Sequence, residues 1–320
     1  MRPVPYQEFL MLSLNPVFSL RTTTVLAVSL SLLGTSARAA DPVRTVAILT
    51  PFQQSVTTNE MINSFQAQAT ARGWKTTVVD TKGDVGQLAS RMEDVISSKV
   101  SAIVIVSTDP NQLKNQIISA GAAKIPVFGL DSGYISGMAM NATSDNTAMS
   151  KTISTFLFKA MNGKGNLVVL TYRAHPGVLK RSQALDAALK LYPGIKVVTE
   201  QQVQVPGPIE NSRKQMENIL LANPGKGAIT AVWAGWDEPA IGVAQALQAA
   251  GRTDVIVTGI DGNSQAVDML QKGSAIRATL KQNFPKMATL VVQQIDRVFR
   301  GQPVTATELY APATLITRKP

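Results

Sequence analysis

The chain has 320 residues, of which 45% are hydrophobic and only 16% are charged, so a disordered chain is excluded and about two domains are expected. The net charge is +10, but the longest basic clusters are single pairs without interleaved aromatics, such as Lys180-Arg181 and Arg213-Lys214, so we expect no nucleic-acid partner. The absence of cysteine excludes disulfides, a thiol nucleophile and thiolate metal sites.

The first 40 residues differ from the rest of the chain. Arg21 precedes the apolar run TTTVLAVSLSLLG (22–34), and the small-residue segment TSARAA (35–40) follows it. This pattern predicts a secretory signal peptide over residues 1–39, cleaved after Ala39. The apolar run is too short for a stable membrane span, and a retained N-terminal anchor is the alternative. An exported chain without cysteine fits the bacterial periplasm, so we expect a periplasmic protein.

After this segment the chain alternates between short apolar runs and helix-length amphipathic stretches. Near-continuous Val/Ile runs followed by amphipathic helices are typical of parallel sheets that are covered on both faces. Strands are predicted at 43–50, 75–81, 102–107, 126–131, 166–172, 195–201, 228–234, 255–261 and 275–282. Helices are predicted between them, for example over 60–72, 90–98 and 181–192.

An internal sequence repeat indicates two similar α/β halves. AIVIVSTDP (102–110) is followed by IPVFGLDSG (125–133), and AITAVWAGWDEP (228–239) is followed by VIVTGIDGN (255–263). Each half therefore has an A-I-x-x-V strand and, later, a strand that ends in G-[LI]-D. A duplicated half-barrel would produce the same repeat, so a (β/α)₈ barrel is an alternative to two doubly wound sheets.

Polar and aromatic side chains stand at the predicted strand ends. Open α/β sheets bind their ligands beyond the carboxyl ends of the strands, where Asp131, Asp261 and the pair Trp236-Asp237 lie. Asp237 has two interpretations, because its carboxylate can cap the helix predicted from Glu238 or face a ligand. A carboxylate only accepts hydrogen bonds, so these aspartates suit a ligand rich in hydroxyl groups.

The usual catalytic motifs are absent. The sequence has no G-x-S-x-G, no H-E-x-x-H and no P-loop motif, and its single histidine, His175, lies in the loop TYRAHPG (171–177). A glycosidase-like pair of Asp131 and Asp261 is the remaining enzymatic alternative. We expect no enzyme activity, no cofactor and no metal site.

The order and spacing of several segments resemble the type I periplasmic substrate-binding proteins of ABC importers, in the ribose- and galactose-binding branch. The resemblance covers residues 43–318. It rests on IPVFGLDSG (125–133), ATSDN (142–146), AVWAGWDEPAIGVAQAL (231–247), DVIVTGIDGN (254–263) and ATLKQN (278–283). It implies two doubly wound, Rossmann-like parallel-sheet domains that are joined by a three-crossover hinge and hold a ligand in the cleft between them.

The resemblance also implies where the two lobes divide. Crossovers are expected near Asp145-Asn146, near Gln282-Asn283 and at residues 301–304. The expected N-terminal lobe comprises 43–145 plus 283–302, and the expected C-terminal lobe comprises 146–282 plus 303–318.

The family's binding site can be carried over by position. The resemblance assigns ligand contacts to Asp131, Arg181, Asp237, Asp261 and Gln282. Their roles in the family are those of a first-lobe aspartate, an arginine at the start of a helix, two further aspartates and a crossover glutamine.

This chain departs from the family pattern at several positions. Ser132 stands where an arginine usually follows the first-lobe aspartate, and Trp236 replaces an asparagine, so Trp236 is expected to cover the apolar face of a sugar ring.

The first loop lacks the family's asparagine and two stacking phenylalanines. It offers Gln54, Thr57 and Thr58 in their place, which leaves Phe52 or Tyr134 to supply an aromatic contact.

The expected function is the capture of a small hydroxylated solute by hinge closure, followed by delivery to an inner-membrane ABC permease. The solute is a sugar, a sugar acid or a polyol. A sugar acid is included because Arg173 and Arg181, which could accept an anionic group, are expected near one rim of the cleft. A periplasmic sensor subunit that presents its bound ligand to a chemoreceptor or sensor kinase is the alternative, and a glycoside hydrolase is the third hypothesis. We expect a monomer.

Overall fold

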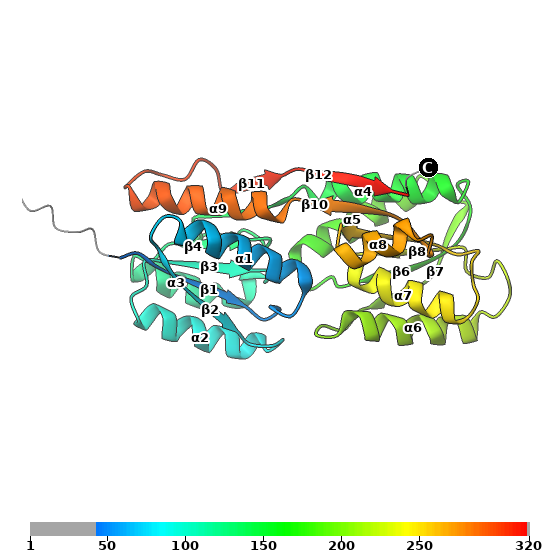
Figure 1. Ribbon diagram of the computed structural model, residues 1–320, viewed down its shortest axis with the longest axis horizontal. Coiled ribbons are helices and arrows are strands. Elements are labelled where there is room, and N and C mark those ends of the chain that lie inside the picture. The colour runs from blue at the N-terminus through cyan, green and yellow to red at the C-terminus, as the bar shows by residue number, and fades with distance from the viewer. Residues whose placement is uncertain (1–42, 319–320) are drawn as a thin grey trace, which may run out of the picture. The chain divides into compact units, whose positions relative to one another are not determined.

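The computed structural model describes residues 43–318, which form two α/β lobes (Figure 1). The predicted signal peptide over residues 1–39 lies outside the described residues. Within 43–318, no helix combines the length and the apolar character needed to cross a membrane.

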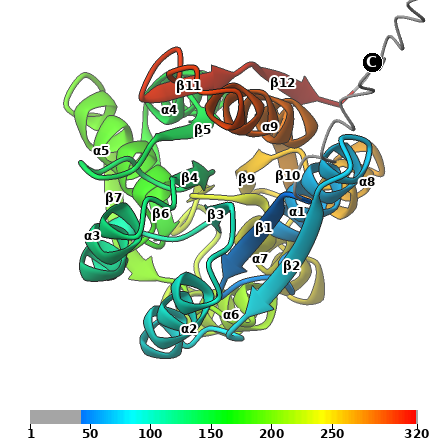
Figure 2. The same ribbon diagram turned by 90° about the vertical axis from the view of Figure 1, so that its left-hand side faces the viewer.

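The first lobe is built on a six-stranded sheet in which every strand pair is parallel, with the order β11-β5-β4-β3-β1-β2. The strands are β1 (Thr45–Thr50), β2 (Lys75–Asp80), β3 (Ala102–Val106), β4 (Val127–Leu130), β5 (Met140–Ser144) and β11 (Glu308–Ala311). Helices cover both faces: α1 (Val56–Thr70) and α9 (Phe284–Phe299) pack on one, and α2 (Val85–Ser97) and α3 (Lys114–Ala122) pack on the other (Figure 2). A short 3₁₀ helix, η1 (Pro110–Leu113), precedes α3.

The second lobe repeats this plan with the strand order β12-β10-β9-β8-β6-β7, in which only β12 is antiparallel to its neighbour. The strands are β6 (Gly165–Thr171), β7 (Ile195–Gln202), β8 (Ala231–Ala234), β9 (Ile256–Asp261), β10 (Ile276–Gln282) and β12 (Ala313–Thr317). One face is covered by α4 (Asn146–Ala160) and α5 (Pro176–Leu189), and the other by α6 (Pro208–Ala222), α7 (Asp237–Ala249) and α8 (Ser264–Gln271).

The segments that repeat in the sequence occupy equivalent places in the two sheets. β3 and β8 occupy the same position in the strand order, and so do β4 and β9. Asp131 follows β4 directly and Asp261 ends β9, so the two aspartates stand at matching strand ends. Two open sheets confirm the doubly wound fold, and the (β/α)₈ barrel is wrong.

The nine predicted strands are all present, whereas β5, β11 and β12 were not predicted. These three are short, and β5 (MNATS) has no Val/Ile run that would mark it as a strand. β11 and β12 are the outermost strands of their sheets, where one edge has no strand partner.

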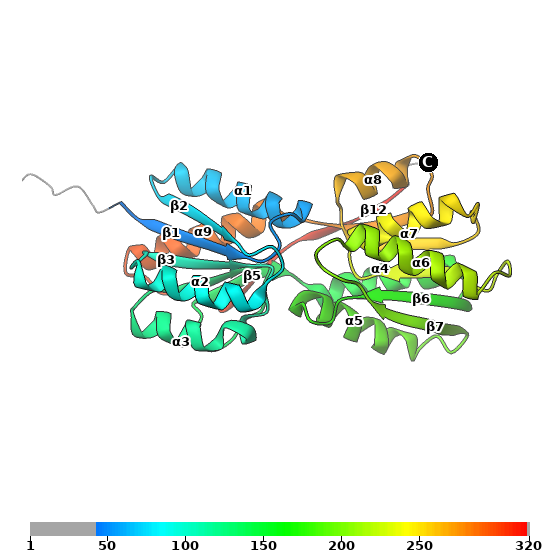
Figure 3. The ribbon, with the colours of Figure 1, turned by 90° about the horizontal axis from the view of Figure 1, so that it is seen from below.

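The chain passes between the two sheets after β5, after β10 and between β11 and β12 (Figure 3). The third crossover, expected at residues 301–304, is therefore wrong. β11 still pairs with β5 in the first sheet, with Glu308 opposite Asn141, and the chain crosses only at Pro312. Proline has no backbone N–H to donate to a strand ladder, so Pro312 interrupts an otherwise continuous extended segment at the point where it changes sheets.

Phe65 tests the packing of the first lobe. Its side chain is fully buried between α1, α9 and the sheet, so Phe65→Ala should lower the free energy of unfolding by about 3–5 kcal/mol through lost burial and the remaining cavity. Urea denaturation followed by far-UV circular dichroism measures the change. Leu221→Ala is the control, because Leu221 is 79% exposed and should change that energy by less than about 0.5 kcal/mol. Equal stabilities of the two variants would contradict the packing described here.

Candidate functional site

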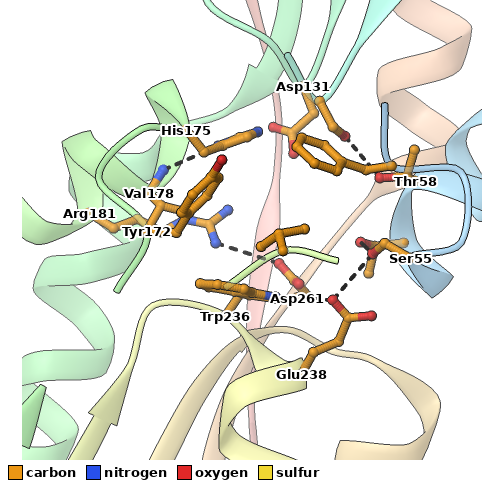
Figure 4. A pocket seen from close by; sticks show the side chains of 14 residues that line it. Ser55, Thr58, Asp131, Tyr172, His175, Val178, Arg181, Trp236, Glu238 and Asp261 are labelled. Atoms are coloured by element: carbon orange, nitrogen blue, oxygen red, sulfur yellow. Dashed lines mark hydrogen bonds and ion pairs between the residues drawn. The ribbon is translucent and has the colours of Figure 1, made fainter. Parts of the chain in front are cut away.

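A cavity between the two lobes is lined by side chains that follow strand ends in both sheets (Figure 4). Its empty volume, including the part that is open to solvent, is about 540 Å³. The first lobe contributes Phe52, Ser55, Thr57, Thr58, Ser107 and Asp131, and the second contributes Tyr172, His175, Val178, Arg181, Val205, Trp236, Glu238 and Asp261.

Asp131 is held by its backbone conformation and by one neighbouring hydroxyl. Its φ of 50° lies in the left-handed region, which aspartate adopts more readily than most residues. The Asp131 N–H donates to the carbonyl of Ala142, and the hydroxyl of Thr143 donates to Asp131 Oδ1 at 2.8 Å. These contacts fix a carboxylate at the first-lobe wall of the cavity.

Asp261 and Arg181 form the opposite wall. Gln282 Nε2 donates to Asp261 Oδ1 at 2.8 Å, and Arg181 Nη1 lies 3.6 Å from the same oxygen. Burial raises the pKa of Asp261 well above its ordinary value, and the positive charge of Arg181 opposes that rise.

The guanidinium of Arg181 is itself buried and engaged by the protein. It is 2% exposed, its Nε donates to Asn146 Oδ1 at 2.7 Å, and its Nη1 donates to the Gly235 carbonyl at 2.9 Å.

Trp236 lines the cavity, and its indole N–H is already bonded. The indole Nε1 donates to Glu238 Oε2 at 3.1 Å, and the ring lies against Tyr172 with centroids 6.4 Å apart. Burial raises the pKa of Glu238, whereas hydrogen bonds from Trp236 and Ser55 oppose that rise.

His175 is the N-cap residue of α5. Its Nδ1 accepts the backbone N–H groups of Gly177 at 3.2 Å and Val178 at 3.4 Å, and burial lowers its pKa. The ring is therefore neutral with its proton on Nε2, beside Asp131 (Figure 4). Within residues 43–318, no group of three or more His, Asp or Glu side chains is arranged to hold a metal ion.

The structure brings five of the nine expected site residues to the cavity and leaves four away from it. Those at the cavity are Asp131, Arg181, Trp236, Asp261 and Thr57. Gln282 reaches the site only through Asp261, Gln54 is not among the lining residues, and Tyr134 packs against the apolar cluster of α2 and α3. Phe52, the other aromatic considered for the first loop, does line the cavity.

Asp237 is buried behind the cavity, and the capping interpretation is wrong. α7 begins at Asp237 itself, with Trp236 as its N-cap residue. The carboxylate accepts the backbone N–H of Asn263 at 2.8 Å and the hydroxyl of Thr279 at 2.7 Å, which ties α7 to two neighbouring segments. Burial raises its pKa to about 6.

Arg173 lies in a surface ion-pair network away from the cavity. Its Nε donates to Glu200 at 2.6 Å and its Nη1 donates to Asp186 at 3.0 Å. Both carboxylates come from its own lobe, so this guanidinium is already paired.

Several lining residues were not anticipated from the sequence. They are Ser55, Ser107, Tyr172, His175, Val178, Val205 and Glu238. All follow the carboxyl end of a strand, by seven residues at most, so a place after a strand end was the one available signal. That signal does not tell which side chains of a loop turn inward.

Comparisons with known proteins agree with this architecture. Residues 46–303 match the family model described as the periplasmic binding protein domain. The D-apiose import binding protein of Actinobacillus succinogenes is 30% identical over 259 residues, which cover 80% of this chain and 82% of that protein. The ribose import binding protein RbsB of Bacillus subtilis is 28% identical over 261 residues, which cover 79% of this chain and 81% of that protein.

A solved structure shows the same fold. The chain superposes with a TM-score of 0.83 on an ABC transporter solute binding protein from Agrobacterium vitis with bound allitol. The two sequences are 27% identical, and the match covers 86% of this chain and 96% of that one.

Asp237 is expected to make stability depend on pH. Its pKa of about 6 exceeds the ordinary 3.8, so between these values the folded protein keeps a proton that the unfolded chain releases. This contribution to stability is complete below the lower value and is lost as the pH rises through about 6. From about pH 4 to pH 7 the melting temperature of the wild type should therefore fall relative to that of Asp237→Asn, which cannot ionise. Calorimetry at several pH values measures the difference, and parallel curves would refute it.

Proposed function

Since the chain belongs to the periplasmic binding protein domain family, we propose that it is the solute-binding component of an ABC importer and holds a small hydroxylated solute between its lobes. The observation that carries this proposal is the meeting of Asp131 and Asp261, from equivalent strand ends of two sheets, at one cavity. The similar proteins support it, because two are import binding proteins for apiose and ribose and the third holds allitol.

The donors and acceptors at the cavity suit hydroxyl groups. The carboxylates of Asp131 and Asp261 accept hydrogen bonds, and charge-assisted bonds of this kind are roughly twice as strong as neutral ones. The ring of Trp236, whose N–H is engaged by Glu238, presents an apolar face that matches the C–H face of a sugar. The cavity therefore combines acceptors for hydroxyls with an aromatic wall.

Of the three solute classes considered, a neutral sugar or polyol fits better than a sugar acid. Arg173 is paired with Glu200 and Asp186 away from the cavity. Arg181 already serves protein acceptors, and three carboxylates line the cavity, those of Asp131, Glu238 and Asp261. Arg181 is the one cation among the lining residues, and Asp261 lies 3.6 Å from its Nη1, so an anionic solute would compete with Asp261 for this positive charge.

The proposed role includes no bond breaking. A glycosidase needs one carboxyl group as an acid and another as a base or nucleophile. Here Asp131 accepts from Thr143 and Asp261 accepts from Gln282, so both carboxyl groups already have a protein partner. The family consists of binding proteins, which supports the same conclusion.

The proposed setting follows from the family and from the leader-like N-terminus. Members of the family are periplasmic binding proteins, and we propose that residues 1–39 direct this chain to the periplasm. There it would deliver its solute to an inner-membrane permease.

Capture is proposed to occur by hinge closure about the three crossovers. The lobes contact each other at the cavity rim: a Cβ at Gly83, after β2, would lie 2.8 Å from Cδ of Pro206, after β7. Such contacts can form only when the two lobes are close together.

A thermal-shift screen tests the solute class. D-ribose, D-apiose and allitol, each with its acid counterpart, are added to the purified protein, and a true ligand at about 100 times its Kd should add about 2.7 kcal/mol of stability. Neutral solutes should raise the melting temperature and their acids should not.

Variants of the cavity carboxylates test the site. Asp131→Ala and Asp261→Ala should abolish the shift, whereas Asp94→Asn, which changes an exposed carboxylate of α2, should preserve it. A full shift in both cavity variants would remove these residues from the site.

Gly83→Ala tests the closure. The added methyl group would collide with Pro206 across the rim and should weaken solute binding by about 1–3 kcal/mol, the usual cost of overpacking. Gly73→Ala is the matched control, because Gly73 also has a positive φ but has no atom within 4 Å of its would-be Cβ. Isothermal titration calorimetry compares the two variants, and equal affinities would argue against closure at this rim.

A further inference from the structure

The N-terminus of α1 is not capped by its own lobe. Ser55 is the N-cap residue, but its side chain accepts no capping hydrogen bond, and the first turn of the helix contains no acidic residue. The first backbone N–H groups of a helix lack intrahelical partners and favour a nearby negative charge. A helix that begins in this way leaves a place for a carboxylate from elsewhere.

Glu238, in the first turn of α7 in the other lobe, occupies that place. The Ser55 hydroxyl donates to Glu238 Oε2 at 3.4 Å, and the backbone N–H of Val56 lies close enough to the Glu238 carboxylate to oppose the rise of its pKa. Figure 4 shows the side chains of Ser55 and Glu238 facing each other across the cavity. The bond between Ser55 and Glu238 is a direct polar contact between the lobes, and its two residues are 183 positions apart in the chain.

The carboxylate is held in this position by its own lobe as well. Trp236 Nε1 donates to the oxygen that Ser55 contacts, and the Glu238 side chain is largely buried, with the residue 8% exposed. A buried carboxylate without hydrogen-bond partners costs free energy. Separation of the lobes would remove the partner that Glu238 has in the first lobe until water replaced it.

We propose that Glu238 is a positioning residue that caps α1 from the opposite lobe and so holds a fraction of the molecules closed before a solute binds. This inference rests on the hinge motion of the proposed function but not on the identity of the solute. Solute binding then adds to a closure that the protein itself already favours, which lowers the conformational cost of capture.

The test measures the separation of the lobes with no solute present. The chain has no cysteine, so Ser90→Cys on α2 and Asn218→Cys on α6 provide the only two thiols for nitroxide labels, both at exposed positions. Pulsed electron paramagnetic resonance gives the distance distribution between the labels in the two lobes. The wild-type background should show a population at the short distance of the structure described here.

Loss of the cap should move molecules to the longer distance. Glu238→Ala should lower the closed-to-open ratio by about tenfold, the effect expected for one hydrogen bond to a charged group. Ser55→Ala should lower it less, and should have little further effect in the Glu238→Ala background, because both residues serve one contact. Glu60→Ala, which removes an exposed carboxylate of α1, is the control and should leave the ratio unchanged.

Two results would overturn the inference: a wild-type background without any closed population, or a Glu238→Ala distribution equal to that of the wild type. If circular dichroism shows that Glu238→Ala does not fold, Glu238→Gln, which keeps the shape and removes the charge, replaces it under the same criterion. Because no solute is used, failure of the thermal-shift screen would count against the proposed function and leave this result standing.

Discussion

The buried guanidinium of Arg181 connects the crossover into the second lobe with the strand ends that form the cavity. Its donors reach Asn146, the first residue of α4, and the carbonyl of Gly235, between β8 and α7. It also lies near Asp261, at the end of β9. A buried cation is stable only when its donors are satisfied in this way, so the positions of these three segments depend on one side chain.

This arrangement also determines the chemistry of the cavity. Arg181 uses its Nε and Nη1 on protein acceptors, and beside it the cavity offers a ligand the carboxyl oxygens of Asp131 and Asp261 as acceptors, with the ring of Trp236 next to them. Buried acceptors need donors, and hydroxyl groups supply them without bringing negative charge into an acidic site. The same reasoning explains why Glu238, the third carboxylate, is engaged by groups from both lobes.

Sequence patterns predicted most of the fold and about half of the candidate site. Buried parallel strands are continuous apolar runs, so nine of them were found, whereas β5, β11 and β12 lack that signal. The duplicated strand ends located Asp131 and Asp261 correctly at the cavity. Tyr134 and Gln54 were expected there on positional grounds, and neither side chain is among the lining residues.

What the sequence by itself determined is the alternation of strands and helices, their duplication and the residues that stand at the strand ends, because these depend on local periodicity and turn chemistry. Only the tertiary structure decided where each side chain points. Asp237 turns inward because Asn263 and Thr279 offer it hydrogen bonds, and Arg173 turns outward to Glu200. Glu238 meets Ser55 across the cavity. Each of these partners is distant in the chain, so no local pattern contains the information.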